Sequence, residues 1–443
     1  MFSNRDLARL LVPLIIEQVL TAFMGTVDTV MVSTISSAAV SGVSLVDSIN
    51  TLMLYIFAAL STGGTIVCSQ YLGKRDLEGA NNAARQVLLS VAVLSTAIMA
   101  ICVGLRRPIL SLIFGAVEPA VMDSALIYFL ITGLSYPFIG LYNVSAALYR
   151  ATGNSKLPMV ISAGSNLLNI IGNTITIFAL HWGVTGAALS TLVSRILACV
   201  VMLVIQRRPH QVLTVGPYHT IRPDFPIIAL VLSIGVPTGL ENGLFQFGKL
   251  AVQSAVSTLS TPEIAAQAIV VVLEAFTSMP SMAIGLGLIT VAGRCMGAGR
   301  PDEAKRYTIK LTILSAAVLF VVNWLVYFLV GPITRLARME AEAAALTCSL
   351  MLVISIVKPF LWPLAFTPVN GMKAAGDVRF AMLISTITMW IFRVGVCYLL
   401  IRGFGFGPLG VWIGMFADWA VRSVVYTIRF FHGRWASKHV LKD

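Results

Sequence analysis

The sequence predicts an all-α membrane protein with twelve transmembrane helices in two pseudo-symmetric six-helix lobes. Three observations predict this class. Charged residues make up only 11% of the 443 residues and hydrophobic residues 57%, whereas soluble domains carry roughly 25% charged residues. Apolar runs of about 20 residues, long enough to span a bilayer as helices, recur along the whole chain. Finally, motifs of the first half return in the second half.

The apolar runs set the expected spans and their orientation. We expect spans at 8–33, 43–69, 86–106, 121–146, 157–180, 185–206, 227–256, 265–290, 309–334, 344–368, 380–402 and 408–428. With the N-terminus in the cytoplasm, the outer segments keep few basic residues: Arg106, Arg107, Arg335, Arg338 and Arg402. Most other lysines and arginines then lie inside, so the positive-inside rule predicts that both termini are cytoplasmic. The net charge of +12 therefore belongs to the inner membrane face and does not indicate a nucleic-acid partner.

The repeat divides the chain into two lobes. Matching residues lie 224 apart in pairs such as Glu17 with Glu241, Gly73 with Gly297 and Gly183 with Gly407. We expect an N-terminal lobe at 1–206, a cytoplasmic linker at 207–226 and a C-terminal lobe at 227–443. Each lobe has an even number of spans, so the two copies have the same topology and are related by an axis along the membrane normal.

Two carboxylates lie in the first predicted span. Glu17 and Asp28 are eleven residues apart, which places them on one face of a helix. An ionised group in hydrocarbon costs roughly 2.5–3.5 kcal/mol on insertion scales, so such groups face a bundle interior or a wet cavity. Glu241 repeats Glu17, but Val252 stands where a second Asp28 would fall. The two copies of the fold therefore have unequal chemistry.

Polar side chains also follow one face of the fifth span. Asn166, Asn169 and Asn173 are spaced by three and four residues, as neighbours on a helix are. Amides within spans most often bond between helices. Three on one face, in a chain with an intramembrane aspartate, favour a cavity, and Thr191 of the sixth span could add a hydroxyl.

These segments resemble a known family. The stretches MGTVDTVMV, YLGKRDLEGAN, LYRATGNSKLPMVISAGSNLLNIIGN and GVTGAALST are similar to motifs of the multidrug and toxic compound extrusion (MATE) family. The resemblance implies a two-lobe transporter that exports organic cations and other amphipathic compounds in exchange for Na⁺ or H⁺. It places the coupling cation or proton site at Asp28, Asn169, Asn173 and Thr191. One carboxylate with amide and hydroxyl oxygens carries a single negative charge, which one Na⁺ or one proton neutralises.

A second set of residues is expected to line a substrate cleft: Glu17, Tyr136, Tyr142, Glu241, Glu274, Lys358 and Trp362. Aromatic side chains could stack on a flat cation. One branch of the family has a Glu and an Asp in the second lobe. Glu241 matches the Glu, but Trp362 stands in place of the Asp. The charged members could instead form structural ion pairs, such as Glu241 or Glu274 with Lys358.

The predicted function is secondary active multidrug efflux by alternating access in the cell membrane. The alternative is a flippase for lipids or lipid-linked saccharides, which would need a strongly cationic cavity. Here the intramembrane carboxylates outnumber the bases, which favours cationic cargo. An enzyme is not expected, because no Ser/His pair, His-rich metal motif or phosphate-binding glycine loop is found. We expect a monomer whose partners are small organic substrates and the bilayer, with no cofactor besides the coupling ion.

Overall fold

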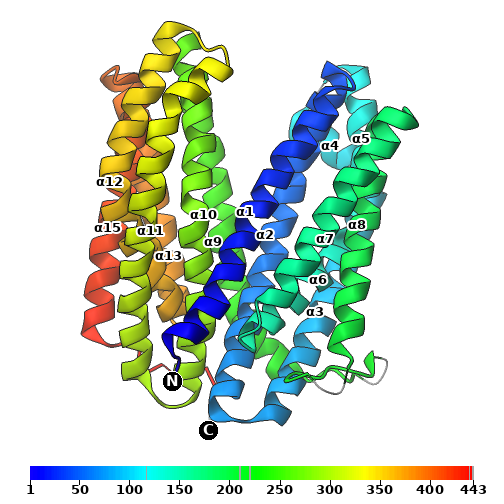
Figure 1. Cartoon of the computed structure of the whole chain (residues 1–443), viewed down its shortest axis with the longest axis vertical. Coiled ribbons are helices and arrows are strands. Elements are labelled where there is room, and N and C mark those ends of the chain that lie inside the picture. Colours follow the sequence, from blue (N-terminus) through cyan, green and yellow to red (C-terminus); the bar gives the residue numbers. More distant parts are fainter. Residues whose placement is uncertain (116, 209–210, 219–220, 439, 442–443) are drawn as a thin grey trace. The chain divides into compact units, whose positions relative to one another are not determined.

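The computed structural model describes residues 1–115, 117–208, 211–218, 221–438 and 440–441. These residues are largely helical and contain no strand. The chain packs as two compact units, Ser3–Gly239, and Leu240–Asp443 together with Met1–Phe2. Each unit is a bundle of long helices (Figure 1). The predicted lobes and the linker at 207–226 follow the sequence repeat and not the packing, so that division stays a prediction.

The helices of the first unit are α1 (Asn4–Ser33), α2 (Ser37–Lys74), α3 (Leu77–Gly104), α4 (Arg106–Phe114), α5 (Pro119–Leu134), α6 (Tyr136–Ala151), α7 (Lys156–Asn173), the wide-turn segment η1 (Thr174–Ala179) and α8 (Gly183–Gln206). Helices α5 and α6 bend by 46° at Ser135, where the predicted span 121–146 was continuous. Pro137 in the first turn of α6 explains the break, because proline cannot donate the backbone hydrogen bond that would continue α5. Helix α4 lies between the predicted spans 86–106 and 121–146.

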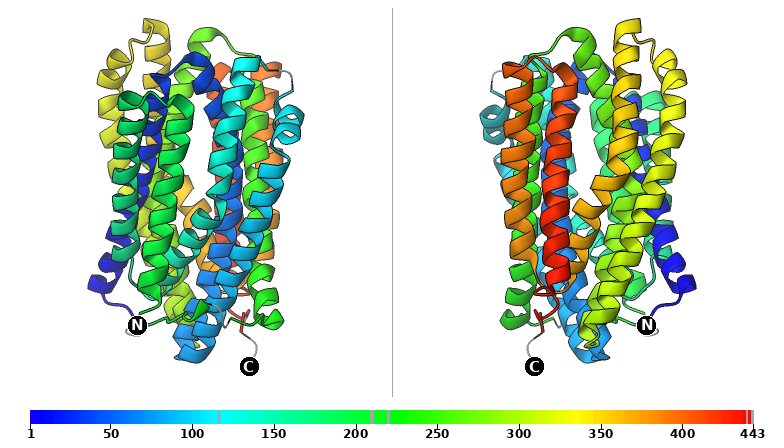
Figure 2. Two further views of the ribbon diagram at one scale, coloured as in Figure 1. Left: turned by 90° about the vertical axis from the view of Figure 1, so that its right-hand side faces the viewer. Right: turned by 90° about the vertical axis from the view of Figure 1, so that its left-hand side faces the viewer.

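The second unit begins within α9 (Phe225–Val256) and continues with α10 (Thr261–Gly297), α11 (Pro301–Leu336), α12 (Ala341–Ala374), α13 (Val378–Thr388), η3 (Met389–Gly395), α14 (Val396–Tyr398), η4 (Leu399–Gly403) and α15 (Gly407–His432). The segments from α13 to η4 form one apolar span. Helix α15 packs against this span and against α12, and Figure 2 shows it in red beside the orange α13.

The apolar helices agree with the predicted class. In the described part of the chain, ten helices are long and apolar enough to cross a membrane, and the bent pair α5 and α6 together makes an eleventh. Helix α15 has 26 residues but also carries the buried ionic side chains Asp418 and Arg422, which lower its mean hydropathy. The prediction of an all-α membrane protein is confirmed.

A glycine contact joins the first half of α9 to the first unit. A Cβ added at Gly63 of α2 would lie 2.7 Å from the carbonyl oxygen of Val231 and 3.2 Å from the backbone nitrogen of Gly235. Gly235 in turn faces Leu60, whose Cδ2 would be 3.1 Å from an added Cβ. Small residues on both helices let the two backbones approach closely, which is a common way for helices to pack in membranes.

We therefore expect Gly63→Ala to destabilise the first unit. The new methyl group would meet a backbone oxygen that cannot rotate away, and overpacking of this kind costs about 1–3 kcal/mol. The measurement is the melting temperature of the purified protein in detergent, with Gly25→Ala as the control because a Cβ there meets no atom within 4 Å. Equal melting temperatures for the two variants would contradict this account of the packing.

Candidate functional site

The structure brings together all four residues predicted for the ion site, within the first unit. Asn173 Nδ2 donates a hydrogen bond to Asp28 Oδ1 at 2.8 Å. The side-chain amide of Asn169 lies 3.2 Å from Thr191 Oγ1 and 3.4 Å from Asn173 Nδ2. Asp28 comes from α1, the two asparagines from α7 and the threonine from α8. Their role in ion binding stays a prediction.

Close packing of three helices explains this meeting. Helix α7 packs against both α1 and α8. A Cβ at Gly172 would lie 2.9 Å from Ser190 Oγ, so α7 and α8 approach closely beside the site. Asn169 and Asn173, one turn apart, are buried at 6% and 1% exposure. Buried amides must bond to other groups in the bundle, so the spacing seen in the sequence becomes a polar seam.

The Asn169 amide completes the polar contacts of Asp28. With its nitrogen toward the carboxylate, it donates to Asp28 Oδ1 at 2.7 Å and to Oδ2 at 3.2 Å, and its oxygen accepts from the Thr191 hydroxyl at 3.2 Å. This orientation gives both the amide and the ionised carboxylate their hydrogen-bond partners. The opposite orientation would set the amide oxygen against the two carboxylate oxygens, which repel it.

A further oxygen at the site lacks a partner. Asn173 Oδ1 is buried and accepts no hydrogen bond. A buried acceptor left in this state costs about 1–3 kcal/mol, which a bound cation or a donor would recover. Among the described residues, no group of three or more His, Cys, Asp and Glu side chains could hold a metal ion. The site around Asp28 instead combines one carboxylate with neutral oxygens, which suits a monovalent ion.

Two charged residues lie near the site. Asp47 and Arg195 both interact electrostatically with Asp28. Arg195 Nη1 donates to Ser135 Oγ at 2.7 Å, and Asp47 Oδ1 accepts from Asn50 Nδ2 at 3.1 Å. Neither residue was predicted for the site. Arg195 could have been found from the sequence, because it is an arginine within a predicted span.

Two of the predicted cleft aromatics are hydrogen-bonded in the interior of the first unit. Tyr136 is buried and donates to Asn50 Oδ1 at 2.8 Å. Tyr142 is also buried, and its hydroxyl donates to the carbonyl of Pro158 at 3.2 Å. Both tyrosines support the packing of the unit, and any role in a cleft stays a prediction. Asn166 is on the same helix as the other asparagines, and its amide nitrogen has no hydrogen-bond partner.

The charges of the second unit form ion pairs. Lys358 is fully buried, and its Nζ lies 2.8 Å from Glu274 Oε1. It also donates to the hydroxyls of Thr277 and Ser278, at 2.7 Å each. Of the two partners predicted for Lys358, Glu274 is therefore confirmed. Glu241 is wrong as its partner, because it pairs with another base.

That base is Lys373, whose Nζ lies 2.6 Å from Glu241 Oε2. The first unit has an equivalent pair, in which Arg150 Nη1 lies 3.4 Å from Glu17 Oε2. The sequence contained a signal for both bases, because Arg150 and Lys373 precede the matching segments ATGN and AAGD. Glu17 and Glu241 were predicted for the substrate cleft, and each is neutralised by a base of its own unit.

Trp362 of the predicted cleft packs in the core of the second unit. It is 7% exposed and stacks on Phe366, with ring centroids 4.7 Å apart.

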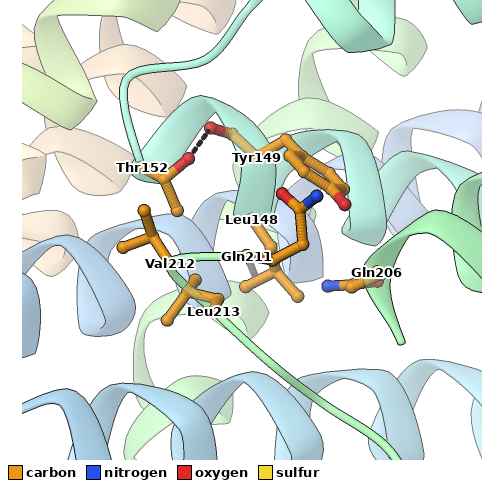
Figure 3. Close-up of a pocket in the computed structure, with 7 residues that line it drawn as sticks. All are labelled: Leu148, Tyr149, Thr152, Gln206, Gln211, Val212 and Leu213. Carbon is orange, nitrogen blue, oxygen red and sulfur yellow. Dashed lines mark hydrogen bonds between the residues drawn. The ribbon is translucent and has the colours of Figure 1, made fainter. Parts of the chain in front are cut away.

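A small pocket in the first unit is not a cargo site. It lies where the segment Gln211, Val212 and Leu213 meets the ends of α6 and α8 (Figure 3). Its volume is about 10 Å³, enough for about one water molecule. The Tyr149 hydroxyl and Gln206 Oε1 in its lining have no hydrogen-bond partner, so a water here would have a structural role.

A comparison with protein families identifies the fold and its repeat. The model of the MatE family matches the chain twice, at residues 13–175 and 237–399. The chain belongs to the MatE family. The two matches start 224 residues apart, which is the spacing of the internal repeat. MatE proteins are the multidrug and toxic compound extrusion transporters, a family of multi-pass membrane proteins whose members are transporters and not enzymes.

Curated relatives of this MatE chain align along nearly its full length. A probable multidrug resistance protein NorM of Thermotoga maritima is 26% identical, and the alignment covers 99% of this chain and 94% of the relative. The multidrug resistance protein PmpM of Pseudomonas aeruginosa is 25% identical, with 96% and 90% covered. YisQ of Bacillus subtilis, named an uncharacterized transporter, is 26% identical over 96% of this chain and 94% of its own.

Solved structures confirm the MatE fold. A MATE protein in its straight conformation superposes with a TM-score of 0.89 at 18% identity, covering 97% of this chain and 96% of its own. An outward-facing multidrug resistance MATE transporter gives a TM-score of 0.87 at the same identity and coverage. The fold is therefore the twelve-helix architecture that the sequence predicts.

The buried pair in the second unit leads to a stability prediction. Lys358→Met should lower the melting temperature, because Glu274 would remain in the bundle without its counter-charge, at a cost of about 3–5 kcal/mol. Lys249→Met is the control, since Lys249 has no ion-pair partner among the described residues. If Lys358→Met melts like the wild type but loses transport, Lys358 acts on the substrate and not on stability.

Proposed function

We propose that this transporter exports amphipathic organic compounds in exchange for Na⁺ or H⁺, and that Asp28 is the residue at which the ion acts. The observation that carries the proposal is the oxygen cluster around Asp28. It contains one carboxylate, an amide oxygen without a partner on Asn173, and an Asn169 amide that bonds to both the carboxylate and Thr191. Multidrug resistance proteins among the relatives support the export of organic compounds.

The exchange follows from the charge state of Asp28. Its hydrogen bond from Asn173 joins α1 to α7 and is charge-assisted while the carboxylate is ionised, which makes it roughly twice as strong as a neutral bond. A bound Na⁺ or proton removes the negative charge and weakens this link. Helices α1 and α7 can then pack differently, which changes the state of the first unit that cargo binds.

Ion and cargo need not share one point in this mechanism. It is enough that the cargo-binding state requires the charge of Asp28 or the space around it. Binding of the ion then disfavours binding of the cargo, and by linkage the cargo disfavours the ion to the same degree. We further propose that both termini lie in the cytoplasm, as the distribution of lysine and arginine indicates. That the protein acts as a monomer is a separate proposal.

The first test replaces Asp28 by asparagine, which keeps the size of the side chain and deletes its charge. Asp28→Asn should fold normally and lose export driven by an ion gradient. The measurement is uptake of a fluorescent organic cation into inverted membrane vesicles under separately imposed Na⁺ and pH gradients. Asp302→Asn, at an exposed position in the first turn of α11, is the control.

Two outcomes would count against this role. Accumulation against a gradient at the wild-type rate by Asp28→Asn would remove Asp28 from the coupling step. Wild-type vesicles that respond to neither gradient, yet move a labelled lipid between leaflets, would favour the flippase.

A second test adds a carboxylate. In Asn173→Asp a second negative charge would lie within hydrogen-bond distance of Asp28, since the native atoms are 2.8 Å apart. Two carboxylates this close cannot both ionise easily, so one retains a proton at higher pH. We expect export to depend more on the pH gradient and less on the Na⁺ gradient. An unchanged ion preference in the same vesicle assay would show that Asn173 does not face the ion.

A further inference from the structure

The second unit contains a cluster of cations that the ion pairs described above do not explain. Three basic side chains surround the ring of Phe245. Lys249 Nζ lies 5.2 Å from the ring centroid, and Arg393 Cζ lies 5.1 Å from it. Arg422 Cζ follows at 6.0 Å. Two of these bases share Asp418, whose carboxylate is 2.6 Å from Arg422 Nε and 3.8 Å from Arg393 Nε.

The cluster carries more positive than negative charge. Among the described residues, Asp418 is the only ion-pair partner of the three bases, and Lys249 has none. Glu274 interacts electrostatically with Lys249 and Arg393, but its ion pair with Lys358 already neutralises it. Cation–π contacts with one ring are worth about 0.5–2 kcal/mol each and do not replace a counter-ion. The cluster therefore lacks an anion.

Arg393 has donors available for such an anion. It is 5% exposed, its Nε lies 3.8 Å from Asp418 Oδ2 without a hydrogen bond, and its Nη1 reaches only the sulfur of Met389, at 3.7 Å. Neighbouring Arg422 is instead held at two points, by Asp418 and by the carbonyl of Ser385 at 2.8 Å. The guanidinium of Arg393 can therefore accept a further oxygen ligand, because its planar fork matches the oxygens of a carboxylate.

Lys249 makes the cluster accessible. Its side chain is exposed, and it follows Phe245 by one turn of α9. A lysine of this kind can move its charge toward an incoming group on a flexible four-carbon stem. The repeat adds a contrast, since Arg393 lies 224 residues after Asn169 of the site around Asp28. At this position of the repeat, the first unit has an amide beside a carboxylate, and the second unit has a cationic side chain.

We propose that Lys249 and Arg393 bind an oxyanion, such as a carboxylate, on an organic cargo molecule. Phe245 holds the two cations while the site is empty, and the oxyanion replaces this weaker contact when cargo binds. The inference rests on the proposed function of export and narrows its substrate class. It extends the cargo from simple organic cations to amphipathic compounds that carry a negative group.

The test compares two dyes that differ in one group. Rhodamine B is a zwitterion with a carboxylate, and its methyl ester is a cation with the same skeleton. Fluorescence polarisation measures the binding of each to the full-length protein in phosphatidylcholine nanodiscs. We expect the wild type to prefer the acid, and Lys249→Gln to weaken binding of the acid about tenfold, as expected for the loss of one hydrogen bond to a charged group. Binding of the ester should be unchanged.

Two variants serve as controls. Lys305→Gln removes another lysine of the second unit that lies over a ring, 5.4 Å from the centroid of Phe431, and should keep the preference for the acid. Lys249→Arg should also keep it, because the charge remains. Equal binding of acid and ester by the wild type would overturn the inference, as would an equal loss for both dyes in Lys249→Gln.

A further arm distinguishes cargo from lipid. Replacing part of the phosphatidylcholine with phosphatidylglycerol should leave the preference for the acid intact. If it abolishes the preference, a lipid phosphate occupies the site and the inference about cargo is wrong. Failure here is separable from failure of the proposed function. If the ester is exported in a way that depends on Asp28 but the protein shows no preference for the acid, the proposed antiport is supported. Only the oxyanion site is then wrong.

Discussion

Every charge in this chain that lies within a helix bundle is constrained by the lack of water there. An ionised side chain in hydrocarbon costs several kcal/mol unless it meets a counter-charge or a set of dipoles. The pairs of Glu17 with Arg150, Glu241 with Lys373 and Glu274 with Lys358 satisfy this condition. Each of these pairs has no net charge, whereas a few other charged residues in the described bundles have no paired counter-charge. Asp28 and Lys249 are among these exceptions, since neither has an ion pair among the described residues.

Much of the fold could be predicted from the sequence, because its causes are local or periodic. Hydropathy placed the spans, and the repeat placed the two copies of the fold. The bends at prolines and the close helix contacts at glycines were harder to predict, since both depend on the neighbouring helix. The bend at Ser135 and the close contact at Gly63 are of this kind. Pro137 could be seen in the sequence, but whether it would bend a span or end it depends on how the neighbouring helices pack.

Asp28 and the three residues around it were found through helical spacing and family motifs, and the structure brings them together. Pairing in the second unit was only half predictable. The cost of an unpaired charge predicted a partner for Lys358 and left Glu241 and Glu274 as alternatives. Glu274 is the partner because α10 packs on α12. Arg150 and Lys373 were missed because each was counted as a cytoplasmic charge at the end of a span. Long side chains of this type can reach inward as well as outward, and hydropathy does not distinguish the two directions.

The placement of the ion pairs has a consequence for biosynthesis. Each of the three pairs has both members in the same half of the chain, on either side of the break in packing between Gly239 and Leu240. A helix with a lone carboxylate leaves the translocon at a cost, and in this chain the compensating base arrives with a later helix of the same half. Arg150 is synthesised after Glu17, and Lys373 after Glu241. Neither half therefore depends on the other to neutralise these charges. The two halves, synthesised as separate polypeptides, would thus each complete these pairs on their own before assembly.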